Sequence, residues 1–162
     1  MTMFTADLTK KEIDGFLAEA NGTSMMAFGG EEPYVIPMGY TYKRGDMLIG
    51  LITKPYGRKM HCLDENPKIC YTVCRTRAMT NLKKPCTTVV IEGTLEKVTD
   101  RNYYGLGPER PEVHGKFGLR LHKVVPNKVS GRRCTQKPCE LIAARQKQRE
   151  AKKAEATKTK KE

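Results

Sequence analysis

The sequence contains no tryptophan and no apolar run of about 18 residues, the length at which a membrane-spanning helix becomes a candidate. No basic-then-apolar leader with a small-residue cleavage site is present at the N-terminus, so no secretory signal is expected. These absences favour a cytoplasmic protein whose six cysteines stay reduced. The cysteines form no CxxC pair, and we therefore expect no metal site.

Acidic residues are also scarce, with 18 Asp and Glu against 30 Lys and Arg, for a net charge of +12. Residues 145–162 contribute eight of the bases and three of the acids, so the rest of the chain is basic as well. The segment after Ile142 has no apolar stripe and cannot bury enough surface to offset the entropy of ordering. We predict one domain over residues 1–140 and a basic tail, helical or disordered, over residues 141–162.

Local patterns predict a helix and a series of strands. Thr9 and Glu12 form a capping-box pattern, and Ile13, Phe16 and Leu17 follow at the spacing of one buried helix face, which predicts a helix over 9–20. Runs rich in β-branched and aromatic residues predict strands at 23–28, 33–42, 46–52, 68–76, 87–98 and 117–133. Six strands with few helices indicate a mainly β protein that closes into an antiparallel barrel, because closure removes exposed edges.

Residues 53–67, TKPYGRKMHCLDENP, combine a tight turn with the start of a short helix that Pro67 should end. The helix N-terminus offers free backbone amides, and Thr53, Lys54, Arg58 and Lys59 add donors and positive charge around Gly57. This combination is typical of a phosphate site. No Walker pattern is present, so a nucleoside triphosphate is not indicated.

A second unusual segment is the predicted strand 33–42, which Pro37 interrupts and in which Gly39 follows. Proline cannot donate to a central ladder, and glycine permits close approach of another group. The segment is therefore an edge or a bulge beside a ligand, or else a purely structural kink; the residues alone leave both interpretations open.

The order of these segments resembles the FMN-binding split β-barrel proteins related to pyridoxamine 5'-phosphate oxidase. The segments that carry the resemblance are 9–20, 34–42, 53–73, 87–98 and 124–133. The branch that it resembles most contains nitroimidazole-resistance reductases, in which a strand runs into Thr or Ser and then Gly-Arg-Lys or a similar triplet. Thr53 and Gly57-Arg58-Lys59 stand at those positions. The resemblance implies a six-stranded antiparallel split β-barrel.

The resemblance also implies site residues and a cofactor. Arg58 and Lys59, with Thr53, would bind the phosphate of FMN, with Lys54 and Gly57 in the same turn. The isoalloxazine would lie along four consecutive residues, Val35, Ile36, Pro37 and Met38. Members of this family are homodimers with flavin at the subunit interface, where Thr88 would approach the cofactor or the partner chain.

Two departures from the family pattern bear on the activity. Ile52 stands where the nitroimidazole-resistance branch often has histidine, and the tryptophan-containing last strand of the true oxidases is missing. Neither named activity is therefore transferred, and catalytic residues stay unknown. The favoured function is an FMN-dependent reductase acting on an unidentified small molecule.

Two alternatives remain open. One is a binding module that holds flavin, haem or deazaflavin without turnover. The other, less favoured, is a nucleic-acid-binding barrel, because Tyr34, Tyr40 and Tyr42 alternate on one strand face and could stack on bases.

Overall fold

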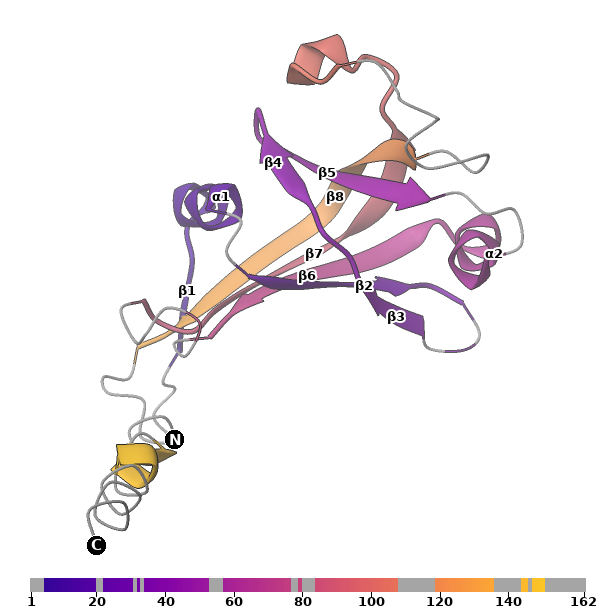
Figure 1. The fold of residues 1–162 in the computed structure, drawn as a ribbon. Helices are drawn as coiled ribbons and strands as arrows, with labels where there is room; N and C mark the ends of the chain where they lie inside the picture. The colour runs from indigo at the N-terminus through magenta and orange to yellow at the C-terminus, as the bar shows by residue number, and fades with distance from the viewer. Residues whose placement is uncertain are drawn as a thin grey trace, which may run out of the picture.

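The protein folds as a curled antiparallel sheet with helices at its ends and sides (Figure 1). The structure is a computed structural model that describes residues 5–19, 22–30, 32, 34–52, 57–76, 79, 84–107, 119–135, 144–145 and 147–150. The strands are β1 (Thr5–Asp7), β2 (Thr23–Phe28), β3 (Tyr34–Pro37), β4 (Thr41–Lys43), β5 (Asp46–Ile52), β6 (Lys68–Arg75), β7 (Thr87–Lys97) and β8 (Leu119–Cys134). The helices are α1 (Lys10–Ala18), α2 (Arg58–Glu65) and the 3-10 helix η2 (Asn102–Tyr104). No helix in the described part of the chain is long and apolar enough to cross a membrane.

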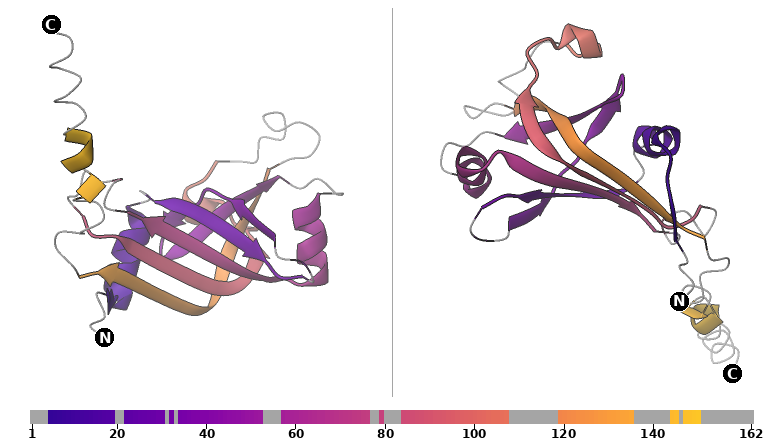
Figure 2. Two further views of the ribbon diagram at one scale, coloured as in Figure 1. Left: turned by 90° about the horizontal axis from the view of Figure 1, so that it is seen from below. Right: turned by 180° about the vertical axis from the view of Figure 1, so that it is seen from behind.

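The sheet has eight strands in the order β3-β2-β6-β7-β8-β5-β4, and β1 adds to β8. All pairings are antiparallel. The long strands β7 and β8 form the middle, and the sheet curls so that its two ends approach each other (Figure 2). This half-barrel confirms the predicted fold class, a mainly β split barrel.

The number of strands differs from the prediction, because the described residues form eight strands and not six. The predicted strand 33–42 is divided into β3 and β4, which lie at opposite edges of the sheet. The division falls after Pro37, where the carbonyl of Met38 leaves the ladder and accepts hydrogen bonds from Ser24 Oγ and the Tyr71 hydroxyl. The strand β1 was not predicted, because three residues are too few for a periodic pattern to show.

The core lies on the concave side of the curled sheet. It forms because successive side chains along each strand point to opposite faces of the sheet. Along β6, Ile69, Tyr71 and Val73 are buried while their neighbours are partly exposed, and Val89 and Ile91 continue the same face on β7. The alternation fixes the register, since a slip by one residue would turn every apolar side chain to the other face.

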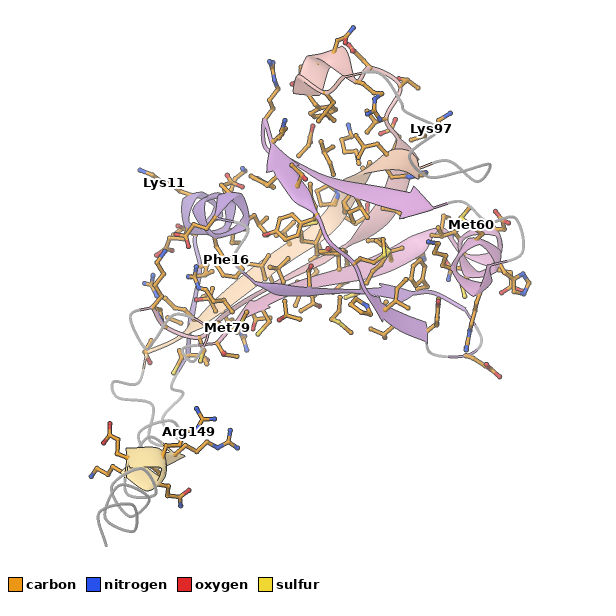
Figure 3. The ribbon with its side chains drawn as sticks, viewed as in Figure 1. Lys11, Phe16, Met60, Met79, Lys97 and Arg149 are labelled. Atoms are coloured by element: carbon orange, nitrogen blue, oxygen red, sulfur yellow. The ribbon has the colours of Figure 1, made fainter. Side chains whose placement is uncertain are left out.

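Helix α1 covers one side of the core in the manner predicted. The Thr9 side chain accepts from the Glu12 amide, and the Glu12 carboxylate accepts from the Thr9 amide, which completes the capping box. Ile13, Phe16 and Leu17 are buried, and Phe16 lies between the helix and the sheet (Figure 3). The helix therefore has the predicted cap, Thr9, begins at Lys10 and buries the predicted face.

Polar contacts at its C-terminal end also hold α1 to the sheet. The Arg75 side chain is buried, its guanidinium carbon lies 4.8 Å from the centre of the Phe16 ring, and it forms an ion pair with Glu19. Lys84 Nζ reaches the same carboxylate at 2.8 Å. Two cations thus share one carboxylate at the end of the helix.

Hydrogen bonds and ion pairs lower the pKa values of three carboxylates in and next to α1. The Lys84 hydrogen bond, helped by Arg75, holds the pKa of Glu19 below its usual value of 4.5. The pKa values of Glu12 and Asp14 are lowered too, chiefly by hydrogen bonds to residues three or four positions earlier. A lowered pKa means that the folded state favours the charged carboxylate more strongly than the unfolded state does.

We expect the thermal midpoint to fall as the pH drops below about 4.5, because protonation removes an interaction that is fully present only above the unfolded-state pKa. Circular dichroism melts between pH 6 and 3 would measure the effect. Glu19→Gln should melt at a lower temperature than the wild type at pH 6, and the difference should shrink toward pH 3. A difference that stays constant with pH would contradict this assignment.

Candidate functional site

Helix α2 places the predicted phosphate-binding residues beside the strand β3. The helix follows β5 and lies between the end of β5 and the β2–β3 hairpin (Figure 1). It is fixed by Cys62, which is buried in the core, and by the Asn66 amide, which donates to the Cys62 carbonyl at 2.8 Å before Pro67. The helix therefore ends before Pro67, as predicted.

Gly57 is the N-cap of α2 and makes no side-chain capping hydrogen bond. The amides of Met60 and His61 donate to the Gly57 carbonyl at 2.9 and 3.2 Å. The amides of Arg58 and Lys59 precede the first intrahelical hydrogen bonds, so this end of α2 presents donors and the positive end of the helix dipole. Such a terminus suits an anion when cationic side chains stand beside it.

Arg58 is held at the edge of the sheet by two neighbours. Its Nη2 lies 3.0 Å from Oε2 of Glu32, and its guanidinium carbon lies 4.8 Å from the centre of the Tyr34 ring. The Tyr34 ring in turn packs against Phe28, with ring centres 5.3 Å apart. Lys59 follows Arg58 on the first turn and is partly buried. The two predicted phosphate ligands are thus together at the start of α2.

The four residues predicted to line the flavin do not share one face of β3. Val35 and Pro37 are exposed, whereas Ile36 and Met38 pack against the core. The reason is the alternation of side chains along a strand, which sends successive residues to opposite faces. If the ligand lies against the outside of β3, only Val35 and Pro37 can offer their side chains to it.

Thr88 lies on the same outer face but far from β3. It is the partner of Cys74 in the β6–β7 ladder, and its Oγ1 is 3.4 Å from Cys74 Sγ. Two strands separate β7 from β3, which places the two strands about 14 Å apart at the usual strand spacing. Within one chain Thr88 is therefore not brought together with the residues around Arg58. Thr53 and Lys54 lie outside the described residues.

The outer face of the sheet carries small and apolar side chains in register. The ladder aligns Val35 with Ala27 and Cys70, and Pro37 with Met25 and Thr72. On this face Val35 is 52% exposed. We call these residues, with Val90 and Thr88 of β7, the outer sheet face.

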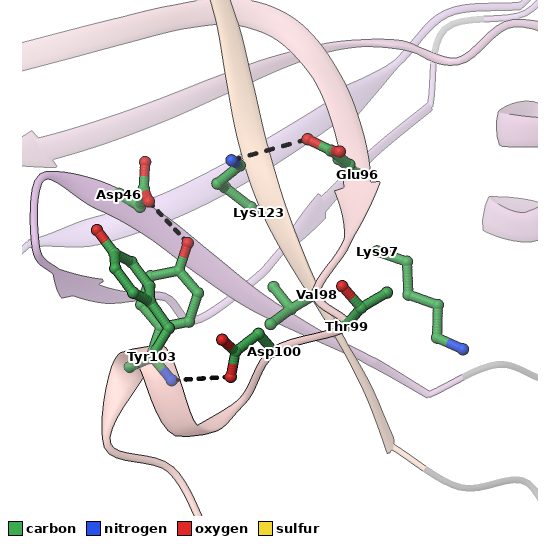
Figure 4. Close-up of a pocket in the computed structure, with 9 residues that line it drawn as sticks. Asp46, Glu96, Lys97, Val98, Thr99, Asp100, Tyr103 and Lys123 are labelled. Carbon is green, nitrogen blue, oxygen red and sulfur yellow. Dashed lines mark hydrogen bonds and ion pairs between the residues drawn. The ribbon is translucent and has the colours of Figure 1, made fainter.

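Two further clefts lie away from α2. The first, of about 330 Å³, is bounded by η2 and the ends of β5, β7 and β8 (Figure 4). Its polar groups largely satisfy one another, since the Tyr104 hydroxyl donates to Asp46 at 2.7 Å and Lys123 lies 3.7 Å from Glu96. Burial, followed by the Asp46 hydrogen bond, raises the pKa of Tyr104 to about 12. The second cleft, of about 460 Å³, is mostly apolar and lies between α1 and the sheet.

The three tyrosines considered for base stacking do not form an exposed platform. The Tyr40 hydroxyl donates to the Leu17 carbonyl at 3.0 Å, and the Tyr42 hydroxyl donates to Asp14 at 2.8 Å. Tyr34 lies between Phe28 and Arg58. In the described part of the chain, no three His, Cys, Asp or Glu side chains converge as a metal site would require.

A family profile described as pyridoxamine 5'-phosphate oxidase matches residues 9–104, more than half of the sequence and a span that includes α1, β2 to β7 and α2. The chain belongs to the pyridoxamine 5'-phosphate oxidase family. The match covers Arg58, Lys59 and β3 together, and so includes the segments that the fold places side by side. None of the curated proteins matches the chain significantly.

Solved structures support the same fold at low sequence identity. An FAD-binding protein from Mesorhizobium loti has a TM-score of 0.59 at 19% identity, over 82% of this chain and 99% of that one. A candidate 5-nitroimidazole antibiotic resistance protein from Bacteroides thetaiotaomicron has a TM-score of 0.60 at 15% identity, over 82% and 89%. The FAD-binding protein from Mycobacterium smegmatis has a TM-score of 0.54 at 13% identity, over 80% and 97%.

Glu32 is the residue of this site that sequence reasoning missed. The segment 29–33, GGEEP, shows two adjacent carboxylates after a glycine pair, which is an ordinary surface turn. Nothing in the sequence placed that turn against a helix 26 residues further along the chain. The contact follows only from the hairpin between β2 and β3.

Proposed function

We propose that this protein binds FMN where β3 meets the start of α2, and that it acts as a flavin-dependent oxidoreductase on a small molecule. The observation that carries the proposal is the position of Arg58, which stands at a helix N-terminus beside an exposed edge strand in a member of the pyridoxamine 5'-phosphate oxidase family. The cytoplasmic location expected from the sequence stays a prediction.

The residues present suit a flavin that carries a terminal phosphate. Arg58 can offer a two-pronged donor to phosphate oxygens, Lys59 adds a point charge, and the backbone amides of the first turn of α2 supply neutral donors. Val35 and Pro37 present an apolar outer edge against which an aromatic ring system can lie. The similar proteins from Mesorhizobium loti and Mycobacterium smegmatis are FAD-binding proteins, which supports a flavin. The choice of FMN rests on this single cluster of phosphate donors.

When bound, the isoalloxazine supplies the redox chemistry, by accepting and passing on electrons or hydride. The contribution of the chain is to position it. Arg58, braced by Tyr34, would fix the phosphate end, and β3 would set the angle of the ring. No side chain of the described site is required to act as an acid or base in this proposal.

A homodimer is part of the proposal. The outer sheet face carries mainly small and apolar side chains in register, half-buried to exposed, which suits a surface that a second copy covers. Thr88 is too far from β3 to serve the same flavin within one chain, but the Thr88 of a second chain packed on this face could approach it. In such a dimer, Thr88 could approach the flavin of the partner chain, which it cannot do within one chain.

We expect the purified protein to retain flavin after it is mixed with FMN and passed through a desalting column. The absorbance spectrum should show flavin bands at about one flavin per chain, and anaerobic NADH or NADPH should bleach them. A protein that retains no flavin, or that shows a Soret band from haem, would contradict the cofactor. Retained flavin that neither donor reduces, and that no acceptor reoxidises after chemical reduction, would favour a binding module without turnover.

The same sample tests the dimer by sedimentation, recorded at a protein wavelength and at a flavin wavelength. The flavin should travel with a species of twice 18.3 kDa. Flavin carried by a species of 18.3 kDa would refute the shared interface while leaving FMN binding intact.

A further inference from the structure

We propose that Glu32 weakens FMN binding and narrows the preference of the site for FMN over riboflavin, because its carboxylate pairs with the guanidinium that the flavin phosphate needs. The inference rests on the proposed function, since it concerns the same Arg58. In the structure the ion pair is formed, with 3.0 Å between Arg58 Nη2 and Glu32 Oε2. A phosphate that approaches the start of α2 must displace this carboxylate or share the guanidinium with it.

The exposure of the two side chains makes displacement feasible. The Arg58 side chain is 50% exposed and the Glu32 side chain 83% exposed, so water screens their attraction and the pair contributes little. A phosphate dianion carries more charge than a carboxylate and accepts two parallel hydrogen bonds from one guanidinium. The phosphate therefore displaces the carboxylate, but it binds less tightly because the ion pair between Arg58 and Glu32 must first be broken.

Arg58 has a second support besides Glu32. Its guanidinium lies over the Tyr34 ring at 4.8 Å, and Tyr34 is itself packed on the buried Phe28. A guanidinium over a ring face is attracted by the ring whether or not an anion stands beside it. Removing the Glu32 charge should therefore leave the guanidinium in position and available to the ligand.

Only ligands with a phosphate compete with Glu32, so its effect is selective. FMN pays the cost of displacing the carboxylate, whereas riboflavin, which has the same ring system and no phosphate, leaves the ion pair in place. Glu32 therefore narrows the preference of the site for FMN over riboflavin.

The test compares Glu32→Gln with Glu65→Gln by titrating each purified full-length variant with FMN and with riboflavin. Glu65 lies at the other end of α2, where it pairs with His61 at 3.3 Å, so the control removes one negative charge from the same neighbourhood. The helix rise separates the two ends by about 10 Å, roughly one Debye length at 0.1 M salt. We expect Glu32→Gln to lower the Kd for FMN about twofold to fivefold, the range that exposed ion pairs contribute. Its Kd for riboflavin, and both Kd values of Glu65→Gln, should stay within about 1.5-fold of the wild type.

Each other result overturns the inference in a distinguishable way. An unchanged or weaker affinity of Glu32→Gln for FMN would show that the carboxylate does not compete with the phosphate. Equal gains in affinity for FMN and riboflavin, or equal gains in affinity in both variants, would indicate a general charge effect and not competition at Arg58. A wild-type protein that binds neither flavin would overturn the proposed function, and this inference with it.

Discussion

Replacing Arg58 and Lys59 together by alanine is expected to weaken FMN binding by at least about 100-fold while the fold is preserved. Hydrogen bonds to charged groups contribute roughly 1.5–3 kcal/mol each, and the double change removes both cationic side chains from the first turn of α2. Neither side chain belongs to the core, and the buried Cys62 continues to anchor the helix. Fluorescence titration with FMN would measure the affinity, and circular dichroism would check the fold.

The matched control for this double change is Lys10→Ala with Lys11→Ala. These two adjacent bases occupy the first turn of α1, and Lys11 points away from the sheet (Figure 3). The control removes the same net charge from the start of the other helix, so its FMN affinity should stay within about twofold of the wild type. Similar losses in both variants would indicate general electrostatic attraction, and no loss in the first variant would remove the phosphate assignment.

Gly93→Ala is expected to be the most damaging Gly→Ala substitution among the described glycines. Gly93 lies at the bulge in the β7–β8 pair, and an added Cβ would stand 2.1 Å from the carbonyl oxygen of Val125. The obstacle is backbone in the longest ladder of the protein and cannot rotate aside, so the strands must separate locally. We expect a loss of at least about 3 kcal/mol in the free energy of unfolding, at or beyond the upper end of usual overpacking costs.

The same chemical change at Gly15 should have the opposite sign. Gly15 is an exposed position within α1, and an added Cβ there would meet nothing within 4 Å. Alanine should therefore raise the free energy of unfolding by about 0.5–1 kcal/mol, because glycine is a poor helix former. Urea unfolding of both variants beside the wild type would give the two values. A Gly93→Ala midpoint close to that of the wild type would contradict the geometry of the bulge.

The elements that could be predicted are the ones whose signals are local in sequence. The capping box of Thr9 and Glu12 and the strand at 68–76 need only a few neighbouring residues, and both were confirmed. The division of 33–42 was harder, because the sequence shows that Pro37 disturbs a strand but not that the chain then crosses to the opposite edge. That crossing is decided by Ser24 and Tyr71, which hold the Met38 carbonyl from two other strands.

The site shows the same limit. Arg58 and Lys59 are adjacent in sequence, and the helix that follows them could be read directly. The carboxylate of Glu32 and the ring of Tyr34 come from another hairpin, so their contacts with Arg58 are tertiary and leave no mark on the local pattern. Strand alternation alone would have turned Ile36 and Met38 inward. The prediction missed this because it followed the family resemblance, which assigned four consecutive residues to the flavin.

The strand order also determines how this protein must assemble. The hairpins β2–β3 and β4–β5 come early in the chain, but they lie at opposite ends of the sheet, and the strands that join them, β6, β7 and β8, come later. During synthesis, one edge of β2 therefore stays unpaired until β6 has left the ribosome, and one edge of β5 stays unpaired until β8 has left it. Because β8 pairs with β1, β5 and β7, a large share of the sheet can close only when the last strand arrives.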